Sequence, residues 1–187
     1  KGYEIVEHHQ KGDIYVINTC TVTNMSDRKS RQMLRRVKEL NNKAVVVACG
    51  CYAQVAKTEL EKIEEIDLIL GNNEKKEIVK YVEEYIENHK KQIEIEDVMY
   101  QKEFVDFGDV TYTEKTRAVI KVQDGCDRFC SYCIIPYARG RVRSRRPESI
   151  VSEIKQIAKE GIQEVVITGI HIASYGKDFK ENINKEY

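Results

Sequence analysis

Three cysteines stand close together in the stretch GCDRFCSYC, residues 125–133. Cys126, Cys130 and Cys133 are spaced C-x3-C-x2-C, and thiolates are ligands for zinc and for iron–sulfur clusters. A structural zinc site takes four protein ligands, and His171 is the only histidine in this half of the chain that could supply the fourth. A four-iron cluster on three cysteines instead keeps one iron open for a substrate or cofactor. A disulfide uses cysteines in pairs and suits a triplet less well.

Charged residues are segregated along the chain, although the formal net charge is zero. Residues 25–43 carry seven Lys or Arg against two acidic residues, and residues 56–106 carry eight Lys against fifteen. The first run is either a solvated helix face or a binding surface. In RGRVRSRR, five arginines predict contacts with phosphate, the alternative being ion pairs with residues 56–106. They are Arg139, Arg141, Arg143, Arg145 and Arg146.

The elements that must position these residues alternate between strand and helix patterns over the first 90 residues. Continuous apolar runs predict buried strands at 13–20, 44–50 and 67–71. Helical spacing of apolar residues predicts helices over 26–40, with Ser26 as N-cap, over 60–66 and over 78–86. GYEIVE, at 2–7, is a possible further strand. This order predicts an α/β fold with a parallel sheet.

Periodicity fades over 91–116, which we interpret as a linker between an N-terminal domain (1–90) and a second unit (117–187). The second unit has a predicted strand at 117–123, a helix that begins at Pro147 and ends before Gly161, and a strand at 164–170. The cysteine triplet thus follows a strand at its carboxyl end, where α/β folds place their chemistry, and Gly140 permits a sharp turn nearby.

Composition excludes some classes of protein. No run of about 18 apolar residues exists, so no membrane span is expected. Six cysteines in a Lys- and Glu-rich chain fit a reducing compartment, and we expect a cytoplasmic protein. The first residue is not Met, so the natural N-terminus is expected to lie upstream.

The triplet, with Tyr132 before its last cysteine, resembles the signature of radical S-adenosylmethionine (SAM) enzymes. The stretches VINTCTVT, GCYAQ, CSYCIIPYARGRVRSR and ITGIHIASYG extend the resemblance, over essentially the whole chain, to the methylthiotransferases. Within that family GCDRFCSYC and GIHIASYG are most similar to the subgroup that modifies N6-threonylcarbamoyladenosine in tRNA. The resemblance implies an N-terminal Rossmann- or flavodoxin-like domain followed by the first part of a partial (β/α) barrel.

The resemblance also implies the roles of particular residues. Cys126, Cys130 and Cys133 would hold a [4Fe-4S] cluster whose open iron binds SAM, with Tyr132, Thr168 and Gly169 near SAM. Cys20 and Cys51 would be ligands of a second, auxiliary [4Fe-4S] cluster, whose third cysteine is expected upstream of Lys1. Simple core packing is the alternative for Cys20 and Cys51, and we expect it for Cys49, which matches no family position.

On the same resemblance, an electron donor such as flavodoxin or ferredoxin reduces the first cluster, which cleaves SAM to a radical that attacks the adenine ring. The auxiliary cluster then supplies sulfur and a second SAM the methyl group. A ribosomal-protein or isopentenyladenosine-tRNA methylthiotransferase is the alternative within the family. Outside it, the alternative is a non-catalytic zinc or iron–sulfur module. Because part of the barrel and an RNA-binding domain are not in these residues, we expect them alone to be inactive.

Overall fold

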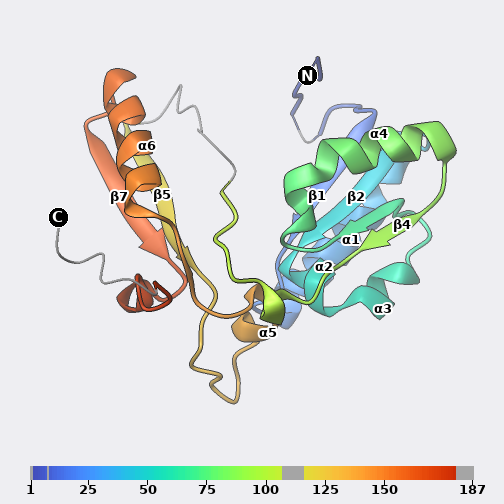
Figure 1. Ribbon diagram of the computed structural model, residues 1–187. Helices are drawn as coiled ribbons and strands as arrows, with labels where there is room; N and C mark the ends of the chain where they lie inside the picture. Colours follow the sequence, from blue (N-terminus) through green and yellow to red (C-terminus); the bar gives the residue numbers. More distant parts are fainter. Residues whose placement is uncertain (1, 8, 107–115, 180–187) are drawn as a thin grey trace. The chain divides into compact units, whose positions relative to one another are not determined.

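The computed structural model describes residues 2–7, 9–106 and 116–179 (Figure 1). The chain divides into two compact units, Lys1–Glu96 and Asp97–Tyr187, here called unit 1 and unit 2. The division falls inside the stretch 91–116 that the sequence assigns to a linker. Residues 107–115 of that stretch lie outside the described residues.

Unit 1 is built on a parallel sheet, as the sequence predicts. Its strands lie side by side in chain order: β1 (Ile14–Thr19), β2 (Val45–Gly50), β3 (Leu68–Leu70) and β4 (Gln92–Glu94). The strand β4 was not expected, because its three residues show no clear period, yet it pairs with β3. Residues 2–7, a possible strand from the sequence, form none.

Four α-helices cover this sheet: α1 (Asn24–Leu40), α2 (Cys51–Val55), α3 (Lys57–Glu61) and α4 (Ile78–Asn88), the last preceded by the 3-10 turn η1 (Glu74–Glu77). α1 begins earlier than expected because Thr23, not Ser26, is its N-cap. The Thr23 Oγ1 accepts a hydrogen bond from the Ser26 backbone N–H at 3.1 Å. The cap fixes the start of a helix whose buried side chains are Ser30, Leu34 and Val37.

The continuous apolar sequence of β2 follows from burial on both faces. Val46 and Ala48 pack in one cluster with residues of α1 and α3, whereas Val45 and Val47 pack in another with Val82 of α4. Successive strand residues point to opposite faces, so helices on both sides of the sheet require apolar residues at every position (Figure 1).

Asp67, just before β3, ties the two helical layers of unit 1 together. Its Oδ2 accepts from the Val46 N–H at 2.8 Å and from Lys38 Nζ at 2.9 Å. Its Oδ1 accepts from the Tyr85 hydroxyl at 2.6 Å. Burial, reinforced by the bond to Asp67, raises the pKa of Tyr85 to about 12. One carboxylate therefore connects α1, β2 and α4.

The Tyr85→Phe variant should lower the free energy of unfolding by about 1 to 2 kcal/mol near neutral pH, because it leaves a carboxylate oxygen without its donor. The raised pKa stabilises the fold below about pH 10, the ordinary tyrosine value. That contribution is lost as pH rises toward about 12, so the variant and the wild type should converge there. Denaturant unfolding across this range measures the difference. Tyr81→Phe, which removes a hydroxyl without a hydrogen bond in the described residues, is the control, and an equal loss in both would contradict the prediction.

Unit 2 is described from η2 (Val98–Tyr100) through β5 (Arg117–Asp124), α5 (Ile135–Arg139), β6 (Arg143–Ser144), α6 (Pro147–Lys159), β7 (Glu164–Gly169) and η3 (Ile172–Ser174). Its sheet has the order β6-β5-β7, with β7 parallel and β6 antiparallel to β5. Ala118, Ile120 and Val122 of β5 pack against Ile157 of α6. Among the residues described in either unit, no helix is both long and apolar enough to cross a membrane.

Two glycines allow the segment after β5 to fold back on itself. Gly125 has φ +71° and Gly140 has φ +81°, both in the left-handed region. A Cβ on Gly125 would collide with the Arg141 carbonyl, and one on Gly140 would collide with the Val98 carbonyl. The Cys126 N–H donates to the Gly140 oxygen at 3.1 Å across this close approach. Glycine is therefore required at both positions.

The Gly125→Ala variant should lower the free energy of unfolding by about 2 kcal/mol more than Gly161→Ala. Both positions have positive φ, at +71° and +85°, so both alanines pay the left-handed penalty of about 1–2 kcal/mol. Only Gly125 adds a backbone collision, because nothing lies within 4 Å of a Cβ on Gly161. Denaturant unfolding of the two variants compares them directly. Equal losses of unfolding free energy in the two variants would contradict the prediction, because they would show that the Arg141 backbone moves aside at no cost.

Candidate iron–sulfur and SAM site

The cysteine triplet lies in the loop between β5 and α5. Cys126 and Cys133 are half-buried and Cys130 is exposed, and all three thiols are free. The Cys133 N–H donates to the Cys130 oxygen at 2.9 Å, which forms a tight turn around the last two cysteines. Within the described residues, no three His, Cys, Asp or Glu side chains are gathered at metal-ligand spacing.

The donor set nevertheless fits an iron–sulfur cluster. Three unpaired thiols on one short loop supply soft ligands, and their partial exposure leaves them accessible to iron. The Nδ1 of the other potential ligand, His171, lies 2.7 Å from the Ser174 hydroxyl on the same turn, so Nε2 is the atom with which it would bind a metal. The three thiols are the soft donors on this loop, and soft thiolates favour an iron–sulfur cluster.

A buried glutamine fixes the start of the cysteine loop. Gln123, the seventh residue of β5, is fully buried. Its Nε2 donates to the carbonyls of Asp124 and Gly125, both at 2.7 Å. Its Oε1 accepts from the His171 N–H at 2.7 Å, so the side chain joins the loop after β5 to the turn after β7. Sequence reasoning missed this residue, although a polar pair at the end of an apolar strand was a visible signal.

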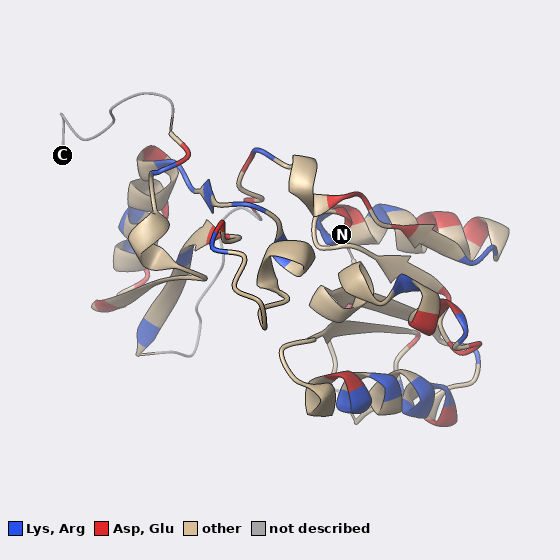
Figure 2. Cartoon of the chain, turned by 90° about the horizontal axis from the view of Figure 1, so that it is seen from below, with Lys and Arg blue, Asp and Glu red and all other residues tan. Residues whose placement is uncertain are grey.

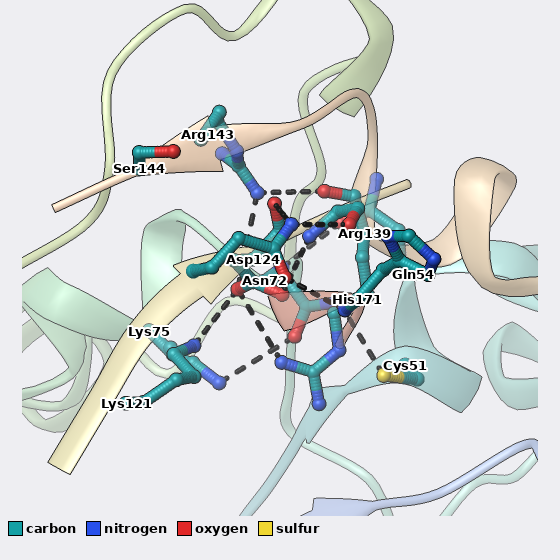
Figure 3. Close-up of polar contacts among 12 residues, drawn as sticks. Cys51, Gln54, Asn72, Lys75, Lys121, Asp124, Arg139, Arg143, Ser144 and His171 are labelled. Atoms are coloured by element: carbon teal, nitrogen blue, oxygen red, sulfur yellow. Dashed lines mark hydrogen bonds and ion pairs between the residues drawn. The ribbon is translucent and has the colours of Figure 1, made fainter. Parts of the chain in front are cut away.

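Asp124 next to it carries a buried charge with several partners (Figure 3). Its Oδ2 lies 2.8 Å from Lys121 Nζ, 3.5 Å from Arg139 Nη1 and 4.0 Å from Arg143 Nη2. Its Oδ1 accepts from the Gly125 N–H at 2.9 Å. Burial alone would raise the pKa of this carboxyl, but the three cations outweigh burial and lower the pKa. The carboxylate is therefore charged, and it holds β5, α5 and β6 around the base of the loop.

Most of the arginines that the sequence assigns to phosphate contacts are used inside unit 2. The side chain of Arg143 is 2% exposed, and it also donates to the Arg139 oxygen at 2.6 Å. Arg145, whose side chain is 7% exposed, pairs with Glu153 and, at 2.9 Å, with Asp106. Binding to phosphate would require these arginines to leave their carboxylate partners. A buried carboxylate without a cation costs free energy, so the ion pairs compete with phosphate binding. These three arginines, Arg139, Arg143 and Arg145, thus have partners within unit 2, and their contact with RNA stays a prediction.

The other two arginines of the stretch are exposed. Arg141 lies 3.7 Å from Asp127, and its guanidinium stands 5.3 Å from the ring centre of Phe129. Arg146 stands 5.2 Å from the ring centre of Phe179. Both remain accessible to a polyanion.

The residues expected near SAM fall at the same edge of the sheet as the cysteine loop. Thr168 pairs with Lys121, and Gly169 pairs with Gln123, so β7 ends beside the end of β5. A Cβ on Gly169 would stand 3.0 Å from the Gln123 side chain, which explains the small residue there. Tyr132 is 90% exposed on the loop itself. Their roles in binding SAM stay a prediction.

In unit 1, Cys20 and Cys51 follow the ends of adjacent parallel strands. The register pairs Thr19 with Gly50, so each cysteine is the next residue after a paired position. The Thr19 hydroxyl donates to the Cys49 oxygen at 2.6 Å and accepts from the Ala53 N–H at 3.1 Å. These two bonds join the end of β1 to the end of β2 and to the start of α2. Cys20 is exposed and Cys51 is buried. They therefore lie at the same end of the sheet, and their role as cluster ligands stays a prediction.

Cys49 is a core residue in this structure. It packs with Val47, Leu70 and Val82 on the face of the sheet that α4 covers. Burial raises the pKa of its thiol, which disfavours the thiolate that a metal needs. Cys49 thus packs in the core, which is the role that the sequence favours for it.

Comparison with known proteins places both units in families. Residues 1–71 match the uncharacterized protein family UPF0004, and residues 120–186 match the radical SAM superfamily. A threonylcarbamoyladenosine tRNA methylthiotransferase of Aquifex aeolicus is 48% identical over 98% of this chain and 45% of its own length. The protein of the same name from Bacillus subtilis is 39% identical over 96% of the chain and 40% of its length. The ribosomal protein uS12 methylthiotransferase of Clostridium botulinum is 33% identical, with 97% and 42% coverage.

The chain thus spans less than half the length of the curated relatives that it matches. Among solved structures, a radical S-adenosylmethionine methyltransferase from Kitasatospora setae matches 87% of this chain and 38% of its own, with TM-score 0.55 and 17% identity. That likeness concerns the fold alone, and it agrees with the α/β architecture expected from the sequence. Together with the cysteine triplet, the two family matches and the relatives over nearly the whole chain show that this chain belongs to the radical-SAM methylthiotransferase family.

Proposed function

We propose that these residues belong to a tRNA methylthiotransferase, an enzyme that converts N6-threonylcarbamoyladenosine beside the anticodon to its 2-methylthio derivative. The observation that carries this proposal is the 48% identity, over 98% of the chain, to a relative named for that substrate. Relatives named for dimethylallyladenosine in tRNA and for a ribosomal protein are 35% and 33% identical, which makes their substrates the second choice.

In unit 2, Cys126, Cys130 and Cys133 would hold a [4Fe-4S] cluster and leave one iron for SAM. When bound, this cluster supplies the single electron that splits SAM into methionine and a 5′-deoxyadenosyl radical, which can attack a strong C–H bond of adenine. The work of the chain is to hold the loop in place. Gln123 and Asp124 do so by joining its first residues to β5, α5 and β6.

In unit 1, Cys20 and Cys51 would be two ligands of a second, auxiliary [4Fe-4S] cluster that supplies sulfur. Their shared edge of the sheet supports this role. Tyr132, Thr168 and Gly169 would contact SAM, and Arg141 and Arg146 remain candidates for contacts with RNA. The electron would come from a donor such as flavodoxin or ferredoxin, and a tRNA substrate would place the protein in the cytoplasm. The two family matches suggest that the boundary between the two domains lies between residues 72 and 119.

The first test is anaerobic reconstitution of the chain with iron and sulfide, followed by electron paramagnetic resonance of the reduced protein with and without SAM. Cys130→Ser should abolish the change that SAM causes, because it removes a ligand of the open-iron cluster, and should release about four irons. Cys20→Ser, another exposed cysteine, is the matched control and should keep the SAM-dependent change. A full SAM response in Cys130→Ser would refute the assignment.

The substrate is tested in cells by analysis of nucleosides from tRNA. A strain in which the gene is disrupted should lose 2-methylthio-N6-threonylcarbamoyladenosine and keep the unmodified threonylcarbamoyl nucleoside. Restoring the gene should restore the methylthio group. If the strain instead loses the methylthio derivative of isopentenyladenosine, or a modification on a ribosomal protein, the proposed substrate is wrong. The protein would then act on the corresponding substrate of the two alternative methylthiotransferases.

A further inference from the structure

The helix α1 presents a strongly basic face away from the sheet. Its buried side is formed by Ser30, Leu34 and Val37, and its other side carries most of its charge (Figure 2). A surface groove on this side is lined by six residues: Arg28, Arg31, Gln32, Arg35, Arg36 and Glu39. We call this groove the α1 basic face. Four of its six residues are arginines, and one is an acid.

Several of these cations are not neutralised within the protein. Arg31 is engaged, since it lies 3.5 Å from Glu59 and donates to the Tyr52 hydroxyl. By contrast, Arg28, Arg35 and Arg36 are exposed, and no carboxylate among the described residues lies within 4.0 Å of their guanidinium groups. Uncompensated charges on one helix face attract a polyanion, whereas a merely solvated face would gain from interspersed acidic partners.

The spacing of the three exposed arginines suits a chain of phosphates. Arg28 and Arg36 are eight residues apart, which is about 12 Å along a helix axis. Arginine forks bind phosphate oxygens through two parallel hydrogen bonds. The other arginine-rich stretch offers fewer cations, because Arg139, Arg143 and Arg145 pair with carboxylates inside unit 2 and leave only Arg141 and Arg146 of its five arginines exposed.

We propose that the α1 basic face is a binding surface for the sugar–phosphate backbone of the tRNA substrate. This inference rests on the proposed function, which supplies the kind of polyanion. The surface positions RNA and does not read its sequence, because phosphate contacts carry no base information. Arg31 stands 5.6 Å from the ring centre of Tyr52, but that ring is buried and offers no surface on which a base could stack, so the face suits a backbone rather than unstacked bases.

The test is the affinity of the chain for tRNA as a function of salt concentration, measured by fluorescence anisotropy. The variant Arg28→Gln, Arg35→Gln, Arg36→Gln keeps good helix formers but removes three charges. Each lost phosphate contact should reduce the slope of log K against log salt by about 0.7 to 0.9, so the triple variant should lose about 2 to 3. Its affinity at low salt should fall at least about tenfold.

The matched control removes three exposed lysines elsewhere in unit 1: Lys11→Gln, Lys57→Gln, Lys62→Gln. It changes net charge equally and should alter the slope by less than about half a unit. Equal effects in the two triple variants, no effect in either, or no tRNA binding by the wild type would each overturn the inference.

A further arm separates RNA from an acidic protein partner. If polyglutamate or a flavodoxin senses the arginine substitutions and tRNA does not, the surface binds protein and the inference fails. Nucleoside analysis of the complemented strain judges the proposed function separately. If the arginine variant makes a normal level of methylthio nucleoside and binds tRNA as the wild type does, the RNA-binding role of the α1 basic face is refuted. The proposed enzymatic function would stand.

Discussion

The buried carboxylate of Asp124 organises the base of the cysteine loop. A charge in this position is costly unless cations and hydrogen bonds surround it. Lys121, Arg139 and Arg143 supply the cations, and the Gly125 N–H supplies a hydrogen bond. These partners come from β5, α5 and β6, so satisfying one charge fixes where the loop begins and where the chain returns after it. Cys130 in the loop is exposed, whereas the base of the loop is joined to three elements.

That arrangement has a consequence for nucleic-acid recognition. Arginines that serve a buried carboxylate are less available to a phosphate, since withdrawing them would weaken the pairing of Asp124 or Glu153. A dense run of arginines in a sequence can therefore be structural. On α1 the situation is reversed, because the helix has its own apolar stripe for packing and three of its four arginines are exposed. The arginines of α1, which are more widely spaced in the sequence than those of residues 139–146, are thus the more accessible ones.

Both units follow one rule of parallel sheets, which is that carboxyl ends of neighbouring strands meet at one edge. In unit 1 the rule brings Cys20 and Cys51 to the ends of β1 and β2. In unit 2 it brings Thr168 and Gly169 of β7 beside the residues that lead into the cysteine triplet. Glycines at Gly50 and Gly125 provide the positive φ angles with which the chain leaves the strands. The sheets therefore bring segments together that are distant in sequence.

Local patterns in the amino-acid sequence were sufficient for much of this description. The apolar runs of β1, β2 and β5, the amphipathic helices and the spacing of the cysteines each depend on neighbours within a few residues, so they can be recognised without a structure. Three features depended on the tertiary structure. The pairing of β4 and β6 depends on distant strands, because three- and two-residue segments have no period of their own. The burial of Cys49 depends on the packing of α4 against its face of the sheet. The division of the arginines into buried and exposed depends on where carboxylates such as Asp106 and Asp124 lie in space, and side-chain charge alone carries no information about its partner.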